Sequence, residues 1–230
     1  MADGSSAASP PDDPVFIDPT ALRCPRLRED IVARPRLVER VLGSPARLTV
    51  ITGPGGSGKS VLLAQCHAEC DHPAWLSIVS ADNDPVVLWT SLLTTLDRYL
   101  GLRAVEVRRR LTAAGPAVLD RVVTDVVEAL EDGGVALDLF VDDLHLLEDD
   151  RSRESLHRFV RYLPAGVRVV AASRSRAPLP VARVRAEGEL EEILGSELAF
   201  TEAETHQVAG GVAVPLPEPV IERLMAVSYT

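Results

Sequence analysis

The chain has 230 residues, of which 46% are hydrophobic, and its formal net charge is −10 at pH 7. This composition is typical of a soluble globular protein and argues against both a disordered chain and a membrane protein. The acidic balance argues against nucleic-acid binding by this segment, because such binding needs a basic surface. With three cysteines and neither a membrane-spanning stretch nor a signal peptide, we expect a cytoplasmic protein without a disulfide framework.

The N-terminal part of the chain divides into two expected segments. Residues 1–20 are small, polar and rich in proline, so we expect a disordered tail. Residues 21–46 form an Arg- and Pro-rich segment that ends in a short helix from about Pro35, because proline is favoured in a first helical turn.

Short apolar segments alternate with helical periodicity along the rest of the chain. We expect strands at residues 48–52, 75–79, 135–141, 167–172 and 190–194. We expect helices at residues 59–69, 85–100, 105–111, 117–131, 152–163, 201–208 and 217–228. This order predicts βαβ units and therefore an α/β fold around a mostly parallel sheet. Because the strand pattern stops near residue 198, we expect residues 199–230 to begin a helical lid subdomain that the end of the chain truncates.

A glycine-rich turn follows the first expected strand and opens the next helix. It runs Gly-Pro-Gly-Gly-Ser-Gly-Lys-Ser over residues 53–60, which matches the phosphate-loop (P-loop) pattern G-x-x-x-x-G-K-[ST]. Glycines let backbone N–H groups surround a phosphate at the positive end of a helix. Lys59, the only lysine of the chain, supplies a charge for the β and γ phosphates, and the Ser60 hydroxyl is a ligand for Mg²⁺. The predicted nucleotide-binding residues are Gly53, Gly55, Gly56, Ser57, Gly58, Lys59, Ser60 and Val61.

Charged side chains follow two further expected strands. Asp142 and Asp143 follow residues 135–141, at the strand end where open α/β sheets bind ligands. We predict that Asp142 supports Mg²⁺ and that Asp143 orients or deprotonates the attacking water; two capping acids in a loop are the alternative. Arg174 follows residues 167–172 and is predicted to sense the γ-phosphate, with Arg176 as its substitute and a surface arginine as the alternative.

Other polar clusters have simpler structural explanations. In the sequence Asp-Asn-Asp-Pro, Asp84 is predicted to cap a helix that begins with Pro85. A zinc site is one interpretation of the cluster Cys66, His67, Cys70 and His72. Zinc sites usually use two separated pairs of ligands, which this cluster does not form, so we favour packing of Cys66 in the core. The guanine-binding pattern N-K-x-D cannot occur beside a single lysine already used at position 59, which favours ATP.

These motifs together resemble a known family. The segments CPRLREDIVARPRLVERV, LTVITGPGGSGKSVLLAQC, AWLSIVSADNDPVVLW, LDLFVDDLHLLED and LPAGVRVVAASRSRAPLPVARVRAEGEL are similar, in order and spacing, to the ATPase module of the large ATP-binding LuxR-type (MalT-like) transcription regulators. Those regulators belong to the STAND class of P-loop ATPases, which are relatives of AAA+ proteins. The resemblance covers roughly residues 21–205.

The resemblance implies a P-loop NTPase three-layer sandwich, with residues 47–198 as the ATPase domain and a five-stranded sheet in the order 5-1-4-3-2. It implies that Lys59 and Asp143 serve catalysis, and that Val32 and Arg34, in residues 21–46, pack against the adenine. It also implies a slow, Mg²⁺-dependent ATPase acting as a signal-transduction switch, with ADP bound at rest and self-association in the ATP state.

The implied partners beyond the nucleotide lie outside this sequence: a small-molecule or protein inducer, and DNA bound through a C-terminal domain. Two other functions stay open at the level of sequence. One is a nucleotide-dependent protein-interaction module without significant turnover, and the other is a P-loop phosphotransferase.

Overall fold

A computed structural model describes residues 17–114, 118–175, 179 and 181–210. Most of the expected N-terminal tail and the expected helix at residues 217–228 lie outside these residues, as does Arg176. Within the described part of the chain, no helix is long and apolar enough to cross a membrane.

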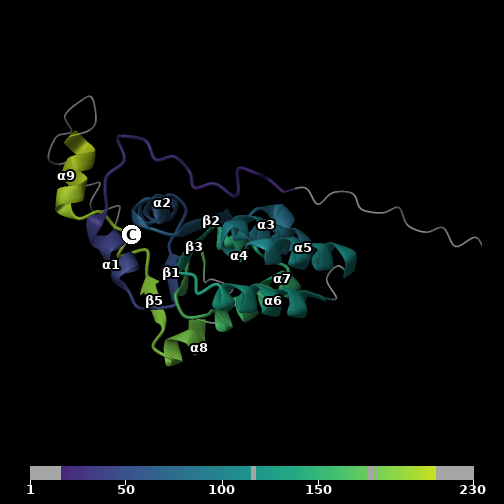
Figure 1. The fold of residues 1–230 in the computed structure, drawn as a ribbon. Coiled ribbons are helices and arrows are strands. Elements are labelled where there is room, and N and C mark those ends of the chain that lie inside the picture. Colours follow the sequence, from purple (N-terminus) through teal and green to yellow (C-terminus); the bar gives the residue numbers. More distant parts are fainter. Residues whose placement is uncertain (1–16, 115–117, 176–178, 180, 211–230) are drawn as a thin grey trace, which may run out of the picture.

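Five strands form one parallel sheet (Figure 1). In chain order they are β1 (Leu48–Thr52), β2 (Pro73–Ser77), β3 (Leu137–Asp142), β4 (Val167–Ser173) and β5 (Leu190–Ile193). Their spatial order is β2-β3-β4-β1-β5, and all four neighbouring pairs are parallel. This arrangement confirms the predicted α/β P-loop NTPase class and the implied order 5-1-4-3-2. The carboxyl ends of β1, β3 and β4 consequently meet at one edge of the sheet.

Helices cover both faces of the sheet. One face packs against α1 (Pro35–Gly43) and α2 (Lys59–Glu69), whose buried side chains join one core cluster with Trp75, Phe140 and Ile193. The other face packs against α3 (Pro85–Thr95), α4 (Asp97–Leu100), α5 (Leu102–Ala114), α6 (Leu119–Asp132), α7 (Asp150–Arg161) and α8 (Val181–Ala186). A final helix, α9 (Glu202–Gly210), follows β5 (Figure 1).

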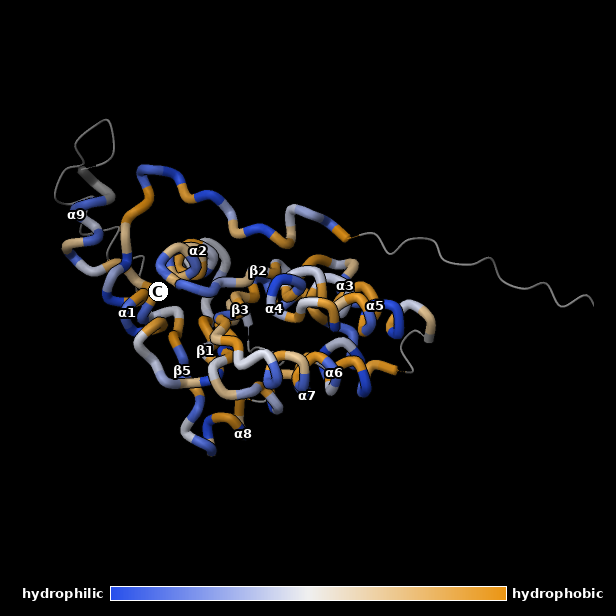
Figure 2. The backbone as a smooth tube through the Cα atoms, viewed as in Figure 1, coloured by the Kyte–Doolittle hydropathy of each residue, from blue (hydrophilic) through white to orange (hydrophobic). Residues whose placement is uncertain are grey.

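The apolar strands explain this three-layer arrangement. Along β3, Leu139 and Val141 belong to one core cluster, whereas Phe140 between them belongs to the other. Hydrophobic residues therefore run along the central strands, whereas hydrophobic and hydrophilic residues alternate along the helices (Figure 2). A strand buried on both faces needs apolar side chains in both directions, which is the pattern that the sequence shows.

Several element boundaries differ from the predictions. β2 begins two residues before the expected strand at residues 75–79, because Pro73 to Ser77 pair with Asp138 to Asp142 of β3. The expected helix at residues 85–100 is interrupted at Leu96, whose ψ of 0° departs from the helical value. The short helix α8 and two 3-10 helices, η1 (Ser80–Asn83) and η3 (Leu144–Leu146), were not predicted.

Candidate functional site

The glycine-rich loop joins β1 to α2, and two of its glycines have left-handed backbones. Gly56 has φ of +80° and Gly58 has φ of +84°, a region that residues with a Cβ rarely adopt. α2 begins directly afterwards at Lys59. The first N–H groups of a helix have no acceptor within that helix, and the helix dipole favours negative charge beside them. The loop geometry therefore suits a phosphate, as the sequence predicts.

Gly53, the first glycine of the loop, lies in close contact with the chain after β5. A Cβ built on Gly53 would lie 2.8 Å from Ser57 Oγ and 3.2 Å from both Gly195 Cα and Leu198 Cδ1. A side chain at this position would therefore force the neighbouring atoms to shift, which favours glycine. The phosphate loop is thus packed against residues 195–198, which lead to α9.

Lys59 lies inside the loop and is only 8% exposed. Its Nζ donates a hydrogen bond to the carbonyl oxygen of Pro54 at 2.7 Å. Burial lowers the pKa of Lys59, the Asp142 carboxylate opposes this change, and the Arg174 guanidinium adds to it. The ammonium therefore lies close enough to the predicted metal ligand and to the predicted γ-phosphate sensor for their charges to influence it.

Asp142 ends β3 and is 5% exposed. Its Oδ1 accepts the backbone N–H of Asp143 at 2.8 Å. Burial raises the pKa of Asp142, while a hydrogen bond with the side chain of Ser60 opposes the rise. A hydroxyl and a carboxylate, both hard oxygen donors, are thus held side by side. They fit Mg²⁺, which binds through one or two protein oxygens together with phosphate oxygens and water.

Asp143 has an unusual backbone conformation. Its φ of 52° makes it the single non-glycine residue with positive φ in the described part of the chain. Its carbonyl oxygen accepts the N–H of Leu146 at 2.9 Å and so closes the turn of η3. The side chain is 43% exposed, which leaves the carboxylate accessible to water.

The Asp-Asn-Asp-Pro segment lies beside this turn. Asp84 caps α3 as predicted, since its carboxylate accepts the N–H of Val86 at 2.7 Å. Sequence reasoning missed Asn83, whose Nδ2 donates to the carbonyl of Leu146 at 2.9 Å. Its Oδ1 accepts the N–H groups of Glu148 at 2.6 Å and Asp149 at 2.8 Å. Asn83 therefore holds the chain that follows the acidic pair.

The end of β4 contributes two side chains. Arg174 is exposed, and its Cζ lies 3.9 Å from an ideal Cβ on Gly55, so the guanidinium reaches the phosphate loop. Ser173 is completely buried, and its Oγ has no hydrogen-bond partner within the described residues. Its carbonyl accepts the N–H of Gly53 at 3.2 Å. Ser173 lies one residue beyond the strand expected at residues 167–172 and was not singled out, because a serine beside an apolar segment carries no distinctive signal.

Val32 and Arg34 are held against α2 by Gln65, a residue that sequence reasoning did not single out. The Gln65 amide donates to the carbonyl of Val32 at 2.9 Å and accepts the N–H of Arg34 at 3.1 Å. The Arg34 guanidinium is buried, with Nε 3.0 Å from Glu204 Oε1 and Nη1 3.9 Å from an ideal Cβ on Gly58. Arg34 thus connects α9 to the phosphate loop, and its predicted adenine contact stays a prediction.

The cysteine and histidine cluster takes part in packing. Cys66 is fully buried, and the ring of His67 packs edge-on against Trp75 and Phe140. The Cys70 thiol donates to Asp138 Oδ2 at 2.8 Å. Within the described part of the chain, no group of three or more His, Cys, Asp or Glu side chains could hold a metal ion.

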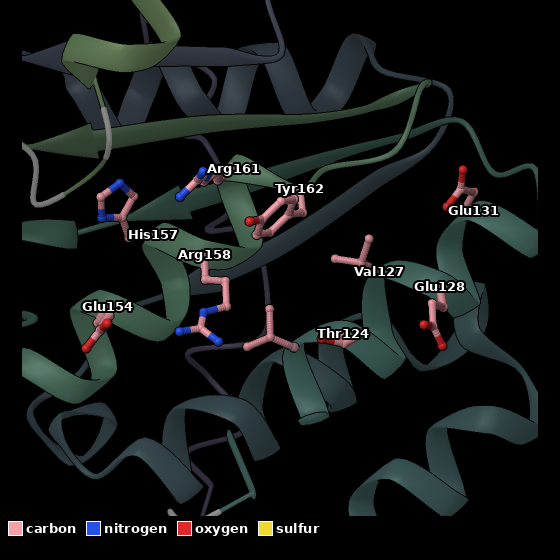
Figure 3. Close-up of a pocket in the computed structure, with 10 residues that line it drawn as sticks. Thr124, Val127, Glu128, Glu131, Glu154, His157, Arg158, Arg161 and Tyr162 are labelled. Atoms are coloured by element: carbon pink, nitrogen blue, oxygen red, sulfur yellow. The ribbon is translucent and has the colours of Figure 1, made fainter. Parts of the chain in front are cut away.

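A separate groove lies between α6 and α7 and has a volume of about 790 Å³ (Figure 3). Glu128 and Glu131 line its α6 side, and His157, Arg158 and Arg161 line its α7 side. None of the predicted nucleotide-site residues lines this groove. The predicted site and this groove are therefore different surfaces.

Comparisons with solved structures give low similarity. A Walker-type ATPase of Pyrococcus abyssi has a TM-score of 0.49 and 16% identity, covering 88% of this chain and 68% of that chain. DnaA from Aquifex aeolicus, bound to AMPPCP, has a TM-score of 0.46 and 16% identity, covering 83% and 54%. Because both scores are below 0.5, the fold assignment depends on the sheet order and on family membership.

Comparisons with known sequences give a stronger result. The HTH-type transcriptional regulator MalT of Yersinia enterocolitica is 29% identical over 208 residues, which are 90% of this chain and 23% of that protein. MalT of Serratia proteamaculans is 30% identical over 190 residues, or 82% and 21%. The chain thus spans less than a quarter of the length of these relatives. The family described as the AAA ATPase domain matches residues 32–171, more than half of the chain. The chain therefore belongs to the AAA ATPase domain family, and within it resembles the MalT regulators, as its sequence motifs indicate.

Proposed function

We propose that this chain is the ATP-binding and ATP-hydrolysing switch module of a LuxR-type transcriptional regulator. The observation that carries the proposal is the convergence of Asp142 and Arg174, from the ends of the neighbouring strands β3 and β4, on the glycine-rich loop that contains Lys59. The MalT similarity supports the regulatory role, since both MalT relatives are described as transcriptional regulators. The predicted cytoplasmic location belongs to the same proposal.

Each residue has a distinct role in the proposed reaction. The loop N–H groups and Lys59 hold the β and γ phosphates, and Arg174 contacts the γ-phosphate. Ser60 and Asp142 would hold Mg²⁺, which when bound would neutralise charge on the phosphate oxygens. Asp143 accepts a proton from the water that attacks the γ-phosphorus, and the bond to the bridging oxygen breaks to give ADP and inorganic phosphate. Val32 and Arg34 are proposed to border the adenine.

For the whole regulator, we propose self-association in the ATP state. We also propose that it responds to an inducer and contacts DNA through a further domain. Residues 199–230 are proposed to begin the helical lid subdomain, in which α9 is the described helix. Contact between Arg34 and Glu204 supports a connection between this helix and the nucleotide site.

Thermal unfolding with and without nucleotide tests binding first. Mg-ATP and ADP should each raise the Tm of the wild-type chain, because a ligand that binds only the folded state stabilises it. Lys59→Ala should abolish the rise. Arg109→Ala removes a positive charge from the exposed side of α5 and should leave the rise unchanged. A folded wild-type chain whose Tm responds to neither nucleotide would contradict the proposal.

Phosphate release tests turnover separately. Asp143→Asn should retain ATP binding and lose hydrolysis. Arg174→Ala should weaken ATP binding about tenfold or more, because a charged hydrogen bond to phosphate is worth about 1.5–3 kcal/mol. ADP binding should be nearly unchanged in Arg174→Ala, since ADP has no γ-phosphate. Binding without measurable turnover in the wild type would instead identify a nucleotide-dependent interaction module. Transfer of the γ-phosphate to an acceptor other than water would identify a phosphotransferase.

A further inference from the structure

His145 lies in η3, two residues after Asp143, and its ring faces the carboxylate. The distance from His145 Nδ1 to Asp143 Oδ1 is 3.8 Å. This separation is about 0.6 Å longer than the upper limit of about 3.2 Å for an N–H···O hydrogen bond. The Asp143 side chain is 43% exposed, so its carboxylate has room to rotate towards His145 Nδ1.

The burial of the ring and the missing partner of its Nδ1 atom support such a contact. His145 Nδ1 is buried and has no hydrogen-bond partner within the described residues, and the side chain as a whole is 15% exposed. A buried polar atom without a partner loses its hydrogen bonds to water and gains none in return, which is unfavourable. The Asp143 carboxylate is an acceptor 3.8 Å from this nitrogen, and an Nδ1–H group is the donor that complements it.

The surrounding backbone is built to keep the two side chains together. The left-handed Asp143 begins the 3-10 turn, and its carbonyl bond to Leu146 N–H places His145 within the same turn. Asn83 anchors the turn from outside by its bond to the Leu146 carbonyl. The backbone therefore keeps the Cα atoms of the two residues in one turn, and the side-chain rotamers of Asp143 and His145 are the remaining freedom.

We propose that His145 is a positioning residue, whose Nδ1–H donates to the Asp143 carboxylate and holds it in the orientation that receives the proton of the attacking water. The role rests on the proposed ATP hydrolysis. His145 itself touches neither nucleotide nor water in this proposal, and acts only through Asp143. Its effect is confined to turnover, since neither side chain is needed for phosphate binding.

Steady-state hydrolysis at saturating Mg-ATP tests the role. His145→Leu should lower kcat about 10- to 100-fold, because a small misplacement of a catalytic group costs up to about 100-fold. The ATP Kd should stay within twofold of wild type. His145→Asn places an amide N–H near the position of Nδ1 and should recover part of the lost rate. His157→Leu, at an exposed histidine in the groove of Figure 3, is the matched control and should not change kcat.

The tautomer of His145 gives a readout independent of hydrolysis. Nitrogen-15 NMR of the wild-type ring should show the Nδ1–H tautomer, and Asp143→Ala should shift the ring towards the Nε2–H tautomer, since the partner of one nitrogen decides which nitrogen is protonated. Either an Nε2–H tautomer in the wild type or an unchanged kcat in His145→Leu would overturn the proposal. If the wild type binds ATP without hydrolysing it, the proposed turnover fails, and the NMR result alone decides whether His145 pairs with Asp143.

Discussion

Asp142 shows how a single residue can lower stability while serving binding. Its carboxylate is 5% exposed, and burial raises its pKa despite hydrogen bonds from Asp143 N–H and Ser60. A buried carboxylate is less favourable in the charged form than a solvated one. The folded chain therefore bears an energetic cost at neutral pH that a metal ion, once bound, would offset.

Replacing the Asp142 carboxylate by a neutral amide predicts the direction in which the free energy of unfolding changes. Because the pKa of Asp142 is raised in the folded chain, the folded chain binds a proton at this residue more readily than the unfolded chain. Protonated Asp142 therefore favours the folded state, and this stabilisation is lost as pH rises through the folded-state pKa. Asp142→Asn should therefore have a larger free energy of unfolding than wild type at pH 7, measured by urea unfolding without nucleotide. The difference should shrink as pH falls towards the ordinary value of 3.8.

Magnesium supplies the control for this prediction. With Mg-ATP present the order should reverse, because ligand binding stabilises the wild type and the amide is a weaker ligand for Mg²⁺. An Asp142→Asn chain that is less stable than wild type in the absence of ligand would contradict the proposed cost of burial.

Site residues could be predicted where the residues that act together are close in the sequence, and could not where they are far apart. Lys59 and Ser60 could be predicted because their chemistry is concentrated within eight consecutive positions, 53–60. Gln65 and Glu204 could not, because their importance comes from bonds to Arg34, which lies 31 and 170 positions away respectively. A glutamine in a helix and a glutamate three residues after a threonine do not reveal a contact with Arg34 until the tertiary structure is known.

At the scale of elements, the phosphate loop and the chain after β5 form one packed unit. Gly53 and Gly195 approach so closely that a Cβ on Gly53 would lie 3.2 Å from Gly195 Cα. The loop geometry consequently depends on an element that arrives about 140 residues later, which the sequence pattern of the loop does not reveal.

Adding one methyl group tests this packing. Gly53→Ala should destabilise the chain by about 1–3 kcal/mol, because overpacking shifts backbone, and should also weaken ATP binding. Gly43→Ala is the matched control: Gly43 ends α1, and a Cβ on this residue would meet nothing within 4 Å. That change should be neutral or slightly stabilising. Equal thermal unfolding curves for both variants would rule out the packing argument.

The sequence predicted which segments are strands and which are helices better than it predicted the residues at which they begin and end. Apolar runs predicted all five strands, because strands buried on both faces are nearly continuous in hydrophobicity. β2 lies two residues earlier than predicted because pairing with β3 sets its register, and Pro73 can open a strand, where the missing N–H is tolerated. The interruption at Leu96 and the six-residue helix α8 depend on tertiary packing that local periodicity does not contain.

At the scale of the whole molecule, a buried ion pair joins the N-terminal segment to α9. The side chains of Arg34 and Glu204 are 4% and 10% exposed, and Arg34 also donates to the carbonyls of Leu198 at 2.9 Å and Ala199 at 3.2 Å. Burial alone would raise the pKa of Glu204, but the Thr201 N–H and Arg34 lower it overall. The pair therefore favours the ionised glutamate.

A double-mutant cycle should reveal this link. Arg34→Met or Glu204→Gln alone should cost about 3–5 kcal/mol, because each leaves a buried polar partner uncompensated. The double variant should cost less than the sum of the two changes. Since the pKa of Glu204 is lowered in the folded chain, its contribution should be present above the ordinary value of 4.5 and lost as pH falls below it. Additive losses in chemical unfolding would show that the two side chains act independently.

The single lysine has a practical consequence for amine chemistry. Lys59 carries the only ε-amino group of the chain, and it is buried in the phosphate loop. Reagents that acylate or cross-link lysine therefore have one side-chain target, and its modification would report directly on access to the loop. For the same reason, immobilisation through lysine would either fail or block nucleotide entry, so attachment through an engineered surface cysteine or a terminal tag is the suitable route for binding measurements.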